Sequence, residues 1–572
     1  MSERAVQVVT EVAPLDRPFD YRVTEKTADV ALGDRVRVQL QQRSVRGWVV
    51  GEAESEGELK PLTKWLGFGP PPSMLAILAW AGERWYGPLS RFLLASSPRH
   101  IVSSLPPAPT KSPLAATVLG GARHRPPGVL ELSPTTDPLG LILDAYQATR
   151  EREGSLLVLV PTEGWANRLR GRLEQRGCHV ASGEAQWDRM RAGWPVVVGS
   201  RGAALAPVPL VAGAVVLDAD DEAFRSDRAP TWNAVTMLRE RCRRDGAPLW
   251  CTSMIPSPAL LGRGDYSTED GVEAGWPRIV VADRRLADPH DGALSRVALD
   301  AAHRALRGSE PVAVVVVLQR LGTGRLFACP QCGELARCAV CAGAEVASEG
   351  GLACRDVHEP RANFCRSCGA TNLRPVRVGV TTMARDVGSQ LGQPVTELTA
   401  TSASATPATP PHRVVVGTEA VWRHVRRAAA VVFLDFDQYL LAPRASARRE
   451  AVIAVGKAGR LVGPRREGRG EVVLQTRRGE DPVVSALSEG RMGHLVDDDR
   501  ATARLLGLAP YGAIAAVSGE GAAAFVERLG ERGVAVHATS SGFEVRARDH
   551  ATLSAALRDV PRPPGRLRVA VE

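Results

Sequence analysis

Residues 327–341 read FACPQCGELARCAVC, and residues 353–370 read ACRDVHEPRANFCRSCGA. Seven of the ten cysteines in the chain therefore lie between Cys329 and Cys368. Six of the seven form pairs with CxxC spacing, a turn that can place two thiolates on one face of a tetrahedral metal ion. The N-terminus carries acidic residues and lacks an apolar secretion segment. The pattern therefore predicts zinc ligands rather than disulfides.

The number of ligands predicts two zinc ions. Three CxxC pairs and Cys354 supply seven thiols, one fewer than two four-ligand sites need. We expect His358, four residues after Cys354, to be the eighth ligand, because imidazole also binds zinc well. The alternative is a set of free or redox-active thiols, although a redox pair normally stands alone on an α/β domain. The expected ligands are Cys329, Cys332, Cys338, Cys341, Cys354, His358, Cys365 and Cys368.

Short apolar runs lie on both sides of the cysteine segment and alternate with amphipathic helical stretches between residues 128 and 480. This alternation predicts parallel sheets that are covered by helices on both faces. The runs are too many for one small sheet, so we expect two α/β lobes, the second of which is interrupted by the cysteines. The strand-like runs lie at residues 156–161, 196–199, 214–218, 278–283, 312–318, 414–417, 430–435 and 471–475.

The two ends of the chain have a different pattern. The first hundred residues begin with short strand-like runs and continue into a helical stretch at 74–86, whereas the tail has an α+β pattern. We expect a multidomain α/β protein with a β-rich N-terminal domain at 1–105 and a Pro-rich linker at 106–127. The other expected parts are a first lobe at 128–270, a second lobe at 271–480 with a zinc-binding insertion at 327–370, and a C-terminal domain at 481–572.

The composition limits the classes of partner. The 572 residues carry 72 Lys and Arg against 63 Asp and Glu, a net charge of +9 that suits a polyanion such as nucleic acid. Charge alone leaves the question open, because lysine is scarce and the arginine content also fits a compositional bias. No apolar run approaches the roughly 18 residues that cross a bilayer. We therefore expect a cytoplasmic protein without membrane contact.

A nucleotide-driven motor would need a glycine-rich phosphate loop, and the sequence contains no GxxxxGK[ST] motif. Where this loop would precede the first helix of the first lobe, residues 131–145 read ELSPTTDPLGLILDA. Pro138 has no N–H to donate, and Asp137 would repel a phosphate. We therefore expect no ATP hydrolysis.

The acidic motif of a motor is also altered. A buried strand is followed by Asp218-Ala219-Asp220-Asp221. Asp218 could hold a metal ion, but Ala219 offers no carboxylate to orient an attacking water. We interpret the four residues as a solvated loop at the end of a strand.

Along most of its length the chain resembles the PriA family, the primosomal N′ proteins of bacterial replication restart, and above all its degenerate actinobacterial form. The N-terminal segments PLDRPFDY (14–21), GDRVRV (33–38) and LKP (59–61) are similar to the family's domain that binds the 3′ end of DNA. The zinc segment and VGVTTMARDVGSQL (378–391) are similar to the family's zinc segment and the helix that follows it. VVGSRGAALAP (197–207), GTEAVW (417–422) and GEVVLQT (470–476) resemble its helicase blocks, and APYGAIAAV (509–517) its C-terminal domain.

The resemblance implies two degenerate RecA-like lobes and a DNA-binding scaffold without helicase activity. It places a pocket for the 3′ end on Phe19, Asp20, Gln41 and Lys60, with Gln41 where the family has glycine. Asp20 can accept a hydrogen bond from a 3′-OH, and Lys60 can neutralise a phosphate. Phe19 can contact a base or sugar, although packing in a β core explains it equally well.

The resemblance also implies the partners and the pairing of the zinc ligands. The expected partners are forked DNA and D-loops with a leading-strand 3′ end, other primosome proteins, single-stranded DNA-binding protein and the replicative helicase. In the family the first and last CxxC pairs share one ion, and the middle four ligands hold the other. Such a protein would be cytoplasmic and associated with the nucleoid.

Two other functions stay open at this level. One is a weak ATP-dependent 3′–5′ helicase with a non-standard nucleotide site, in which Arg460 could serve as an arginine finger. The other is a zinc-organised protein hub that hardly contacts DNA.

Overall fold

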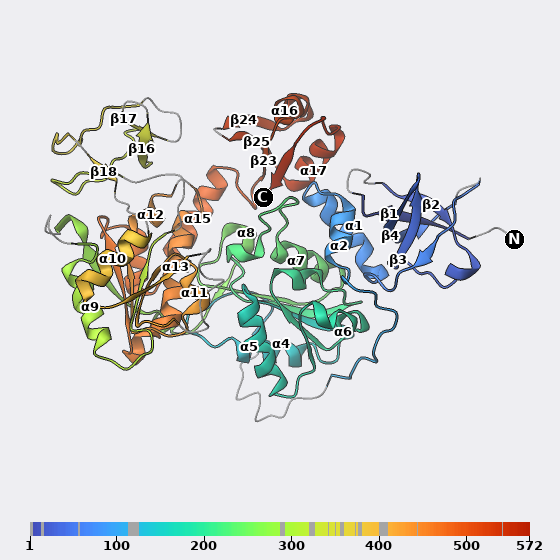
Figure 1. Ribbon diagram of the computed structural model, residues 1–572, viewed down its shortest axis with the longest axis horizontal. Helices are drawn as coiled ribbons and strands as arrows, with labels where there is room; N and C mark the ends of the chain where they lie inside the picture. The colour runs from blue at the N-terminus through green and yellow to red at the C-terminus, as the bar shows by residue number, and fades with distance from the viewer. Residues whose placement is uncertain are drawn as a thin grey trace. The chain divides into compact units, whose positions relative to one another are not determined.

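The computed structural model of the chain describes most of its residues (Figure 1). The described ranges are 4–12, 17–54, 58–111, 125–262, 264–286, 292–319, 327–340, 343–348, 351–354, 360–371, 373–375, 380–399, 410–442, 444–539 and 541–572. The described chain divides into two compact units, one of residues 1–130, 137–267 and 500–572, the other of residues 131–136 and 268–499.

The N-terminal part of the first unit is a sheet of five strands in the order β2-β1-β4-β3-β5. The strands are β1 (Ala5–Thr10), β2 (Phe19–Arg22), β3 (Arg35–Leu40), β4 (Arg43–Glu52) and β5 (Lys64–Trp65). The chain before β5 also bonds to β2, because the backbone N–H of Arg22 donates to the carbonyl of Lys60 at 2.9 Å. The segment from Lys60 to Trp65 therefore links the two edges of the sheet. A small apolar core that includes Val8, Tyr21 and Val36 lies inside it.

Two helices, α1 (Pro72–Arg84) and α2 (Leu89–Ala95), follow the sheet. Their buried side chains, such as Leu78 and Phe92, belong to the same apolar core as one face of the first lobe. The C-terminal domain also joins this core. Its four strands run in the order β24-β25-β23-β26. Its elements are β23 (Ala513–Ser518), α16 (Ala522–Leu529), β24 (Ala535–Thr539), β25 (Gly542–Ala547), α17 (His550–Asp559) and β26 (Arg568–Val571).

The first lobe contains a sheet of seven strands in the order β12-β6-β11-β10-β7-β9-β8. Its central strands are parallel, and their side chains are almost entirely buried, as the continuous apolar runs predict. Helices α4 (Leu139–Ala148) and α5 (Glu163–Glu174) cover one face, and α7 (Ala234–Arg244) packs on the other. The strands are β6 (Gly128–Glu131), β7 (Ser155–Leu159), β8 (Val180–Ala181), β9 (Val196–Gly199), β10 (Val211–Val216), β11 (Leu249–Ser253) and β12 (Ser267–Thr268).

The second lobe contains a parallel sheet of six strands in the order β13-β22-β21-β14-β20-β19. Helices α9 (Arg296–Leu306) and α10 (Val380–Leu391) pack on one face of it, and α13 (Ala447–Val462) contacts β21 and β22 (Figure 1). The strands are β13 (Arg278–Asp283), β14 (Val314–Val317), β19 (Val395–Leu398), β20 (Val414–Gly417), β21 (Ala430–Phe433) and β22 (Glu471–Thr476).

The cysteine segment lies between β14 and α10 and has two small ladders. One pairs β15 (Phe327–Ala328) with β18 (Arg374–Pro375), and the other pairs β16 (Glu345–Ser348) with β17 (Gly351–Cys354). Among its described residues, six buried side chains form an apolar core, and two of them are cysteines: Phe327, Cys329, Ala336, Leu352, Cys365 and Leu373. A core of this size needs further support, and structural metal ions commonly supply it.

The fold class expected from the sequence is confirmed. All eight strand-like runs between 156 and 475 contain an observed strand, and the predicted helix at 74–86 corresponds to α1. The loop at 401–411 lies almost wholly outside the described residues, as does most of the linker at 106–127. In the part of the chain that the structure describes, no helix has the length and apolar character to cross a membrane. The finer division into five parts stays a proposal.

Candidate metal centre and nucleic-acid interface

The first and last CxxC turns have the same backbone conformation. In the first, the N–H of Cys329 donates to the carbonyl of Glu334 and the N–H of Gly333 to that of Cys329, at 2.8 and 3.0 Å. The last turn repeats both bonds, from Cys365 and Gly369, at 2.7 and 2.9 Å. Gly333 and Gly369 have φ of 74° and 76°, a region that favours glycine, so each turn needs a glycine directly after its second cysteine.

These two turns bring four thiols together. The sulfurs of Cys329, Cys332, Cys365 and Cys368 all lie within 4.8 Å of one another. The Sγ atoms of Cys329 and Cys368 are 3.5 Å apart, as are those of Cys332 and Cys365. A tetrahedral zinc ion with bonds of about 2.3 Å would hold its sulfurs at roughly 3.8 Å from one another. The four residues therefore fit one zinc ion.

The backbone around this cluster favours thiolates. The N–H of Gln331 donates to the Sγ of Cys329 at 3.4 Å. Burial raises the pKa of Cys365, but N–H groups of Cys368 and Ser367 and the neighbouring thiols bring it down to about 7. At Cys332 the N–H of Glu334 lowers the pKa, but burial and the neighbouring thiols raise it to about 12, so zinc must displace protons when it binds the cluster.

The middle CxxC turn is described only in part. The N–H of Cys338 donates to the carbonyl of Gly343 at 2.9 Å, the bond that also begins the other two turns. The N–H of Val340 donates to the Sγ of Cys338 at 3.4 Å. Cys354 ends β17 opposite Glu345, whose carboxylate forms a buried ion pair with Arg361. Two of the expected ligands, Cys341 and His358, lie outside the described residues.

The residues expected to bind the 3′ end come from neighbouring segments of the N-terminal sheet. Phe19 and Asp20 are on β2 and half-buried, whereas Gln41, in the β3–β4 turn, and Lys60 are exposed. The hydroxyl of Tyr21 donates to the carbonyl of Gln39 at 3.2 Å, which ties β2 to the strand before Gln41. Gln41 has a φ of 53°, the left-handed conformation that glycine adopts without cost, so glycine would suit this position well.

The ring of Phe19 also has a specific contact. The guanidinium of Arg17 lies 5.0 Å from its centroid, a cation–π geometry. Phe19 is therefore a partly exposed ring beside a cation, and a negatively charged strand could contact both.

A carboxylate of the chain itself lies at the start of α4. The Asp137 carboxylate accepts a hydrogen bond from the N–H of Leu139 at 3.1 Å and forms a two-bond ion pair with Arg172. The bonds from Arg172 lower the pKa of Asp137, so the group is a carboxylate at neutral pH. The carboxylate of Asp137 thus provides the negative charge that a helix N-terminus favours.

Residues 131–136, which belong to the second unit, bond to another carboxylate. The Thr136 hydroxyl donates to Glu269 at 2.5 Å, and that of Thr135 donates to the carbonyl of Gly275 at 2.7 Å. Arg460 on α13 donates from Nε to the carbonyl of Pro134 at 3.0 Å. The hydroxyls of Thr135 and Thr136 therefore donate to oxygens of the protein itself, and the Nε of Arg460 donates to a carbonyl of the same loop.

The acidic loop after β10 has structural contacts. The hydroxyl of Ser253 donates to Asp220 at 2.8 Å. Asp221 is 7% exposed and accepts from the N–H of Ala223 at 2.9 Å, where it caps a short helical turn. The prediction of a solvated loop is wrong for Asp221, because the carboxylate replaces a missing backbone acceptor.

Sequence reasoning did not find Glu269, nor Arg284 and Arg477 at the end of the second sheet, nor Arg374 in the zinc segment. Glu269 is 133 residues away from Thr136, and no local pattern connects them. Arg284 and Arg477 directly follow β13 and β22. The rule that ligands bind at the carboxyl ends of parallel strands would have singled them out.

These features define a multidomain class of α/β protein in which two lobes with parallel sheets are joined to a β-rich N-terminal domain and a four-cysteine cluster that fits a metal ion. A sequence model of the 3′ DNA-binding domain (3′BD) of PriA matches residues 7–98. The probable replication restart protein PriA of Mycobacterium leprae (strain TN) is 27% identical over 89% of this chain and 86% of its own length. Its counterpart in Mycobacterium tuberculosis (strain ATCC 25618 / H37Rv) is 28% identical over 89% and 85%.

The chain is therefore similar to PriA replication restart proteins over most of its length, and its N-terminal part matches the PriA 3′ DNA-binding domain. Among solved structures, the helicase Lhr of Mycobacterium smegmatis is 13% identical, with a TM-score of 0.35 over 66% of this chain and 50% of its own. Dbp5 of S. cerevisiae is 10% identical, with a TM-score of 0.36 over 76% and 98%.

Proposed function

We propose that this chain recognises stalled forks and D-loops by the 3′ end of the leading strand and helps to reload the replicative helicase without unwinding DNA. The observation that carries the absence of a motor is the filled loop before α4. Asp137 caps this helix, Thr136 is bonded to Glu269, and Pro138 lacks the N–H that a phosphate would need.

Recognition of the 3′ end rests on the N-terminal domain. The partly exposed Phe19, the carboxylate of Asp20 and the ammonium group of Lys60 supply a ring, a hydroxyl acceptor and a phosphate partner. We further propose two zinc ions, one on the first and last CxxC turns and one on Cys338, Cys341, Cys354 and His358. The zinc segment and the C-terminal domain would then contact the other primosome proteins, single-stranded DNA-binding protein and the helicase.

Lys60→Glu should weaken binding to a fork with a 3′ end at its junction by about tenfold. The plot of log affinity against log salt should also become shallower by about one, because one phosphate contact is lost. Fluorescence anisotropy over a salt series measures both. Lys26→Glu, an exposed lysine of the same domain, is the matched control and should change affinity less than twofold. Equal affinities for the two variants would contradict the proposed pocket.

Asp20→Asn tests the terminal hydroxyl. A 3′-phosphate should reduce the affinity of the native chain for the fork, because the carboxylate of Asp20 repels it. In the variant the fork with a 3′-OH and the fork with a 3′-phosphate should bind with similar affinity. A variant that still discriminates as strongly as the native chain would remove Asp20 from the pocket. A chain that binds none of the forks would favour the protein hub instead.

A further inference from the structure

A pocket of about 230 Å³ lies between the zinc segment and the second lobe. The second lobe contributes residues that follow β13, β22, β21 and β14, four neighbouring strands of its parallel sheet. The zinc segment contributes Ala328, Cys329, Pro330 and Arg374. Sheets of this type bind ligands at the carboxyl ends of their strands, at the point where the strand order reverses. Here the order reverses at β14, because β20 and β21, which follow each other in the chain, lie on its two sides.

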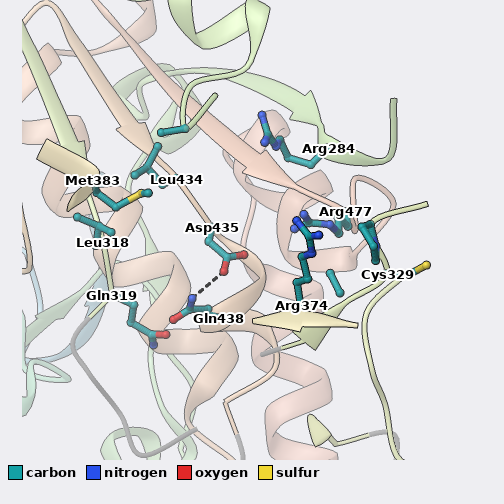
Figure 2. Close-up of a pocket in the computed structure, with 13 residues that line it drawn as sticks. Arg284, Leu318, Gln319, Cys329, Arg374, Met383, Leu434, Asp435, Gln438 and Arg477 are labelled. Atoms are coloured by element: carbon teal, nitrogen blue, oxygen red, sulfur yellow. Dashed lines mark hydrogen bonds between the residues drawn. The ribbon is translucent and has the colours of Figure 1, made fainter. Parts of the chain in front are cut away.

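Three arginines line this pocket. Figure 2 shows Arg284, Arg374 and Arg477 gathered on one side of it, near Cys329. Arg374 is exposed and Arg284 is half-buried. The Nε of Arg477 is buried, and within the described ranges it has no hydrogen-bond partner. Buried donors normally have a hydrogen-bond acceptor, so a ligand could supply the one that the Nε of Arg477 lacks. Three guanidinium groups together favour an anion such as a phosphate.

The charges around the pocket support this assignment. Asp435 is the one carboxylate in its lining, and it accepts a hydrogen bond from Gln438 at 2.6 Å. The buried Asp437 lies behind, 3.9 Å from Arg477. Arg337 of the zinc segment adds a further cation, and burial followed by the charge of Arg478 lowers its pKa. Three arginines and one carboxylate therefore line the pocket, so its lining carries a net positive charge.

The opposite side of the pocket is apolar. Leu318, Met383 and Leu434 lie there together with Gln319, and Asp435 and Gln438 lie between them and the arginines (Figure 2). The pocket thus offers cations for a phosphate, oxygen and amide groups for the polar edge of a ring, and apolar side chains for its face. Its volume is below that of a typical drug-sized site, which limits the ligand to a single small unit.

We propose that this pocket binds one nucleotide unit, with its phosphate at Arg284, Arg374 and Arg477 and its base against Leu318 and Met383. The carboxylate of Asp435 favours a base that presents N–H donors, such as guanine. The nucleotide comes from a DNA strand or from free solution, and the chemistry of recognition is the same in both cases. The site lies in the second unit and does not depend on the proposed recognition of a 3′ end.

The test is binding of dGMP to the full chain by calorimetry. Arg374→Glu and Arg284→Glu should each weaken binding at least tenfold. Arg426→Glu is the matched control, because Arg426 is exposed and precedes β21, at the opposite edge of the same sheet. Arg477 is left unchanged, since its loss would remove the guanidinium that lies 3.9 Å from the buried carboxylate of Asp437. Zinc content and melting temperature show whether each variant is folded. If Arg374→Glu is not folded, Arg374→Gln is measured in its place.

The outcomes separate the alternatives. Competition of dGMP with a short single strand identifies a nucleotide of DNA as the occupant, and binding of dGMP without such competition identifies a free nucleotide. No binding of dGMP at millimolar concentration, or binding that neither arginine variant weakens, would overturn the proposal. Lys60→Glu should bind dGMP like the native chain, so failure of this site and failure of fork recognition are distinguishable.

Discussion

Cys365→Ser is expected to lower the zinc content by about one equivalent per chain and to unfold the segment between β15 and β18. Cys365 is one of four thiols within 4.8 Å of one another, and it also belongs to the six-residue core of the segment. In small metal domains the zinc ion contributes roughly 10–16 kcal/mol, and the segment has few other contacts to replace it. Metal analysis and limited proteolysis of residues 327–375 measure the two effects.

A matched control separates zinc binding from the loss of a thiol. Cys178 is buried in the core of the first lobe, far along the chain from the cluster, so Cys178→Ala should keep the native zinc content. Cys338→Ser and His358→Ala test the second ion, and each should remove about one equivalent if the middle ligands bind zinc. Native zinc content in Cys365→Ser would contradict the four-thiolate site.

The pH dependence of zinc binding follows from the same ligands. Because zinc binds thiolates, protonation competes with the metal, and acid should release zinc while neutral pH retains it. Metal content after dialysis at a series of pH values tests this direction.

ATP hydrolysis by the purified chain should stay at the level of buffer alone, with or without forked DNA. The start of α4 is capped by Asp137, and Thr136 donates its hydrogen to Glu269, so these groups have no place for a phosphate. An active motor would raise the rate by orders of magnitude over background, which makes the absence easy to detect. A phosphate-release assay with forked DNA measures it.

Asp218→Asn distinguishes a scaffold without ATPase activity from the weak ATP-dependent helicase. If the chain has a real ATPase, stimulation by DNA should be present in the native chain and lost in the variant. Arg460→Ala should then reduce it as well, although Arg460 already bonds to the loop through Pro134. A DNA-stimulated rate that Asp218→Asn abolishes would refute the proposed scaffold, whereas a rate unchanged by both variants would indicate a contaminant.

Local features of the sequence predicted much of the fold. The strand at 414–417 was recognisable because four successive apolar residues are buried on both faces of a parallel sheet. The strands β16 and β17 were not foreseen, because they lie among polar residues and depend on the contacts around Glu345 and Arg361. Phe19 and Asp20, which we propose bind the 3′ end, were suggested by family resemblance alone, since half-buried strand residues have no distinctive pattern.

The sequence by itself determined the first and last turns of the zinc segment, because a CxxC pair followed by glycine forms its hydrogen bonds within six residues. The family resemblance implied which turns share a cluster. Only the tertiary structure decided that the hydroxyl of Thr136 donates to Glu269, and that Arg284, Arg374 and Arg477 line one pocket. The physical reason is distance along the chain. Short-range bonds are fixed by local geometry, whereas contacts between residues a hundred or more positions apart depend on how whole sheets and helices pack.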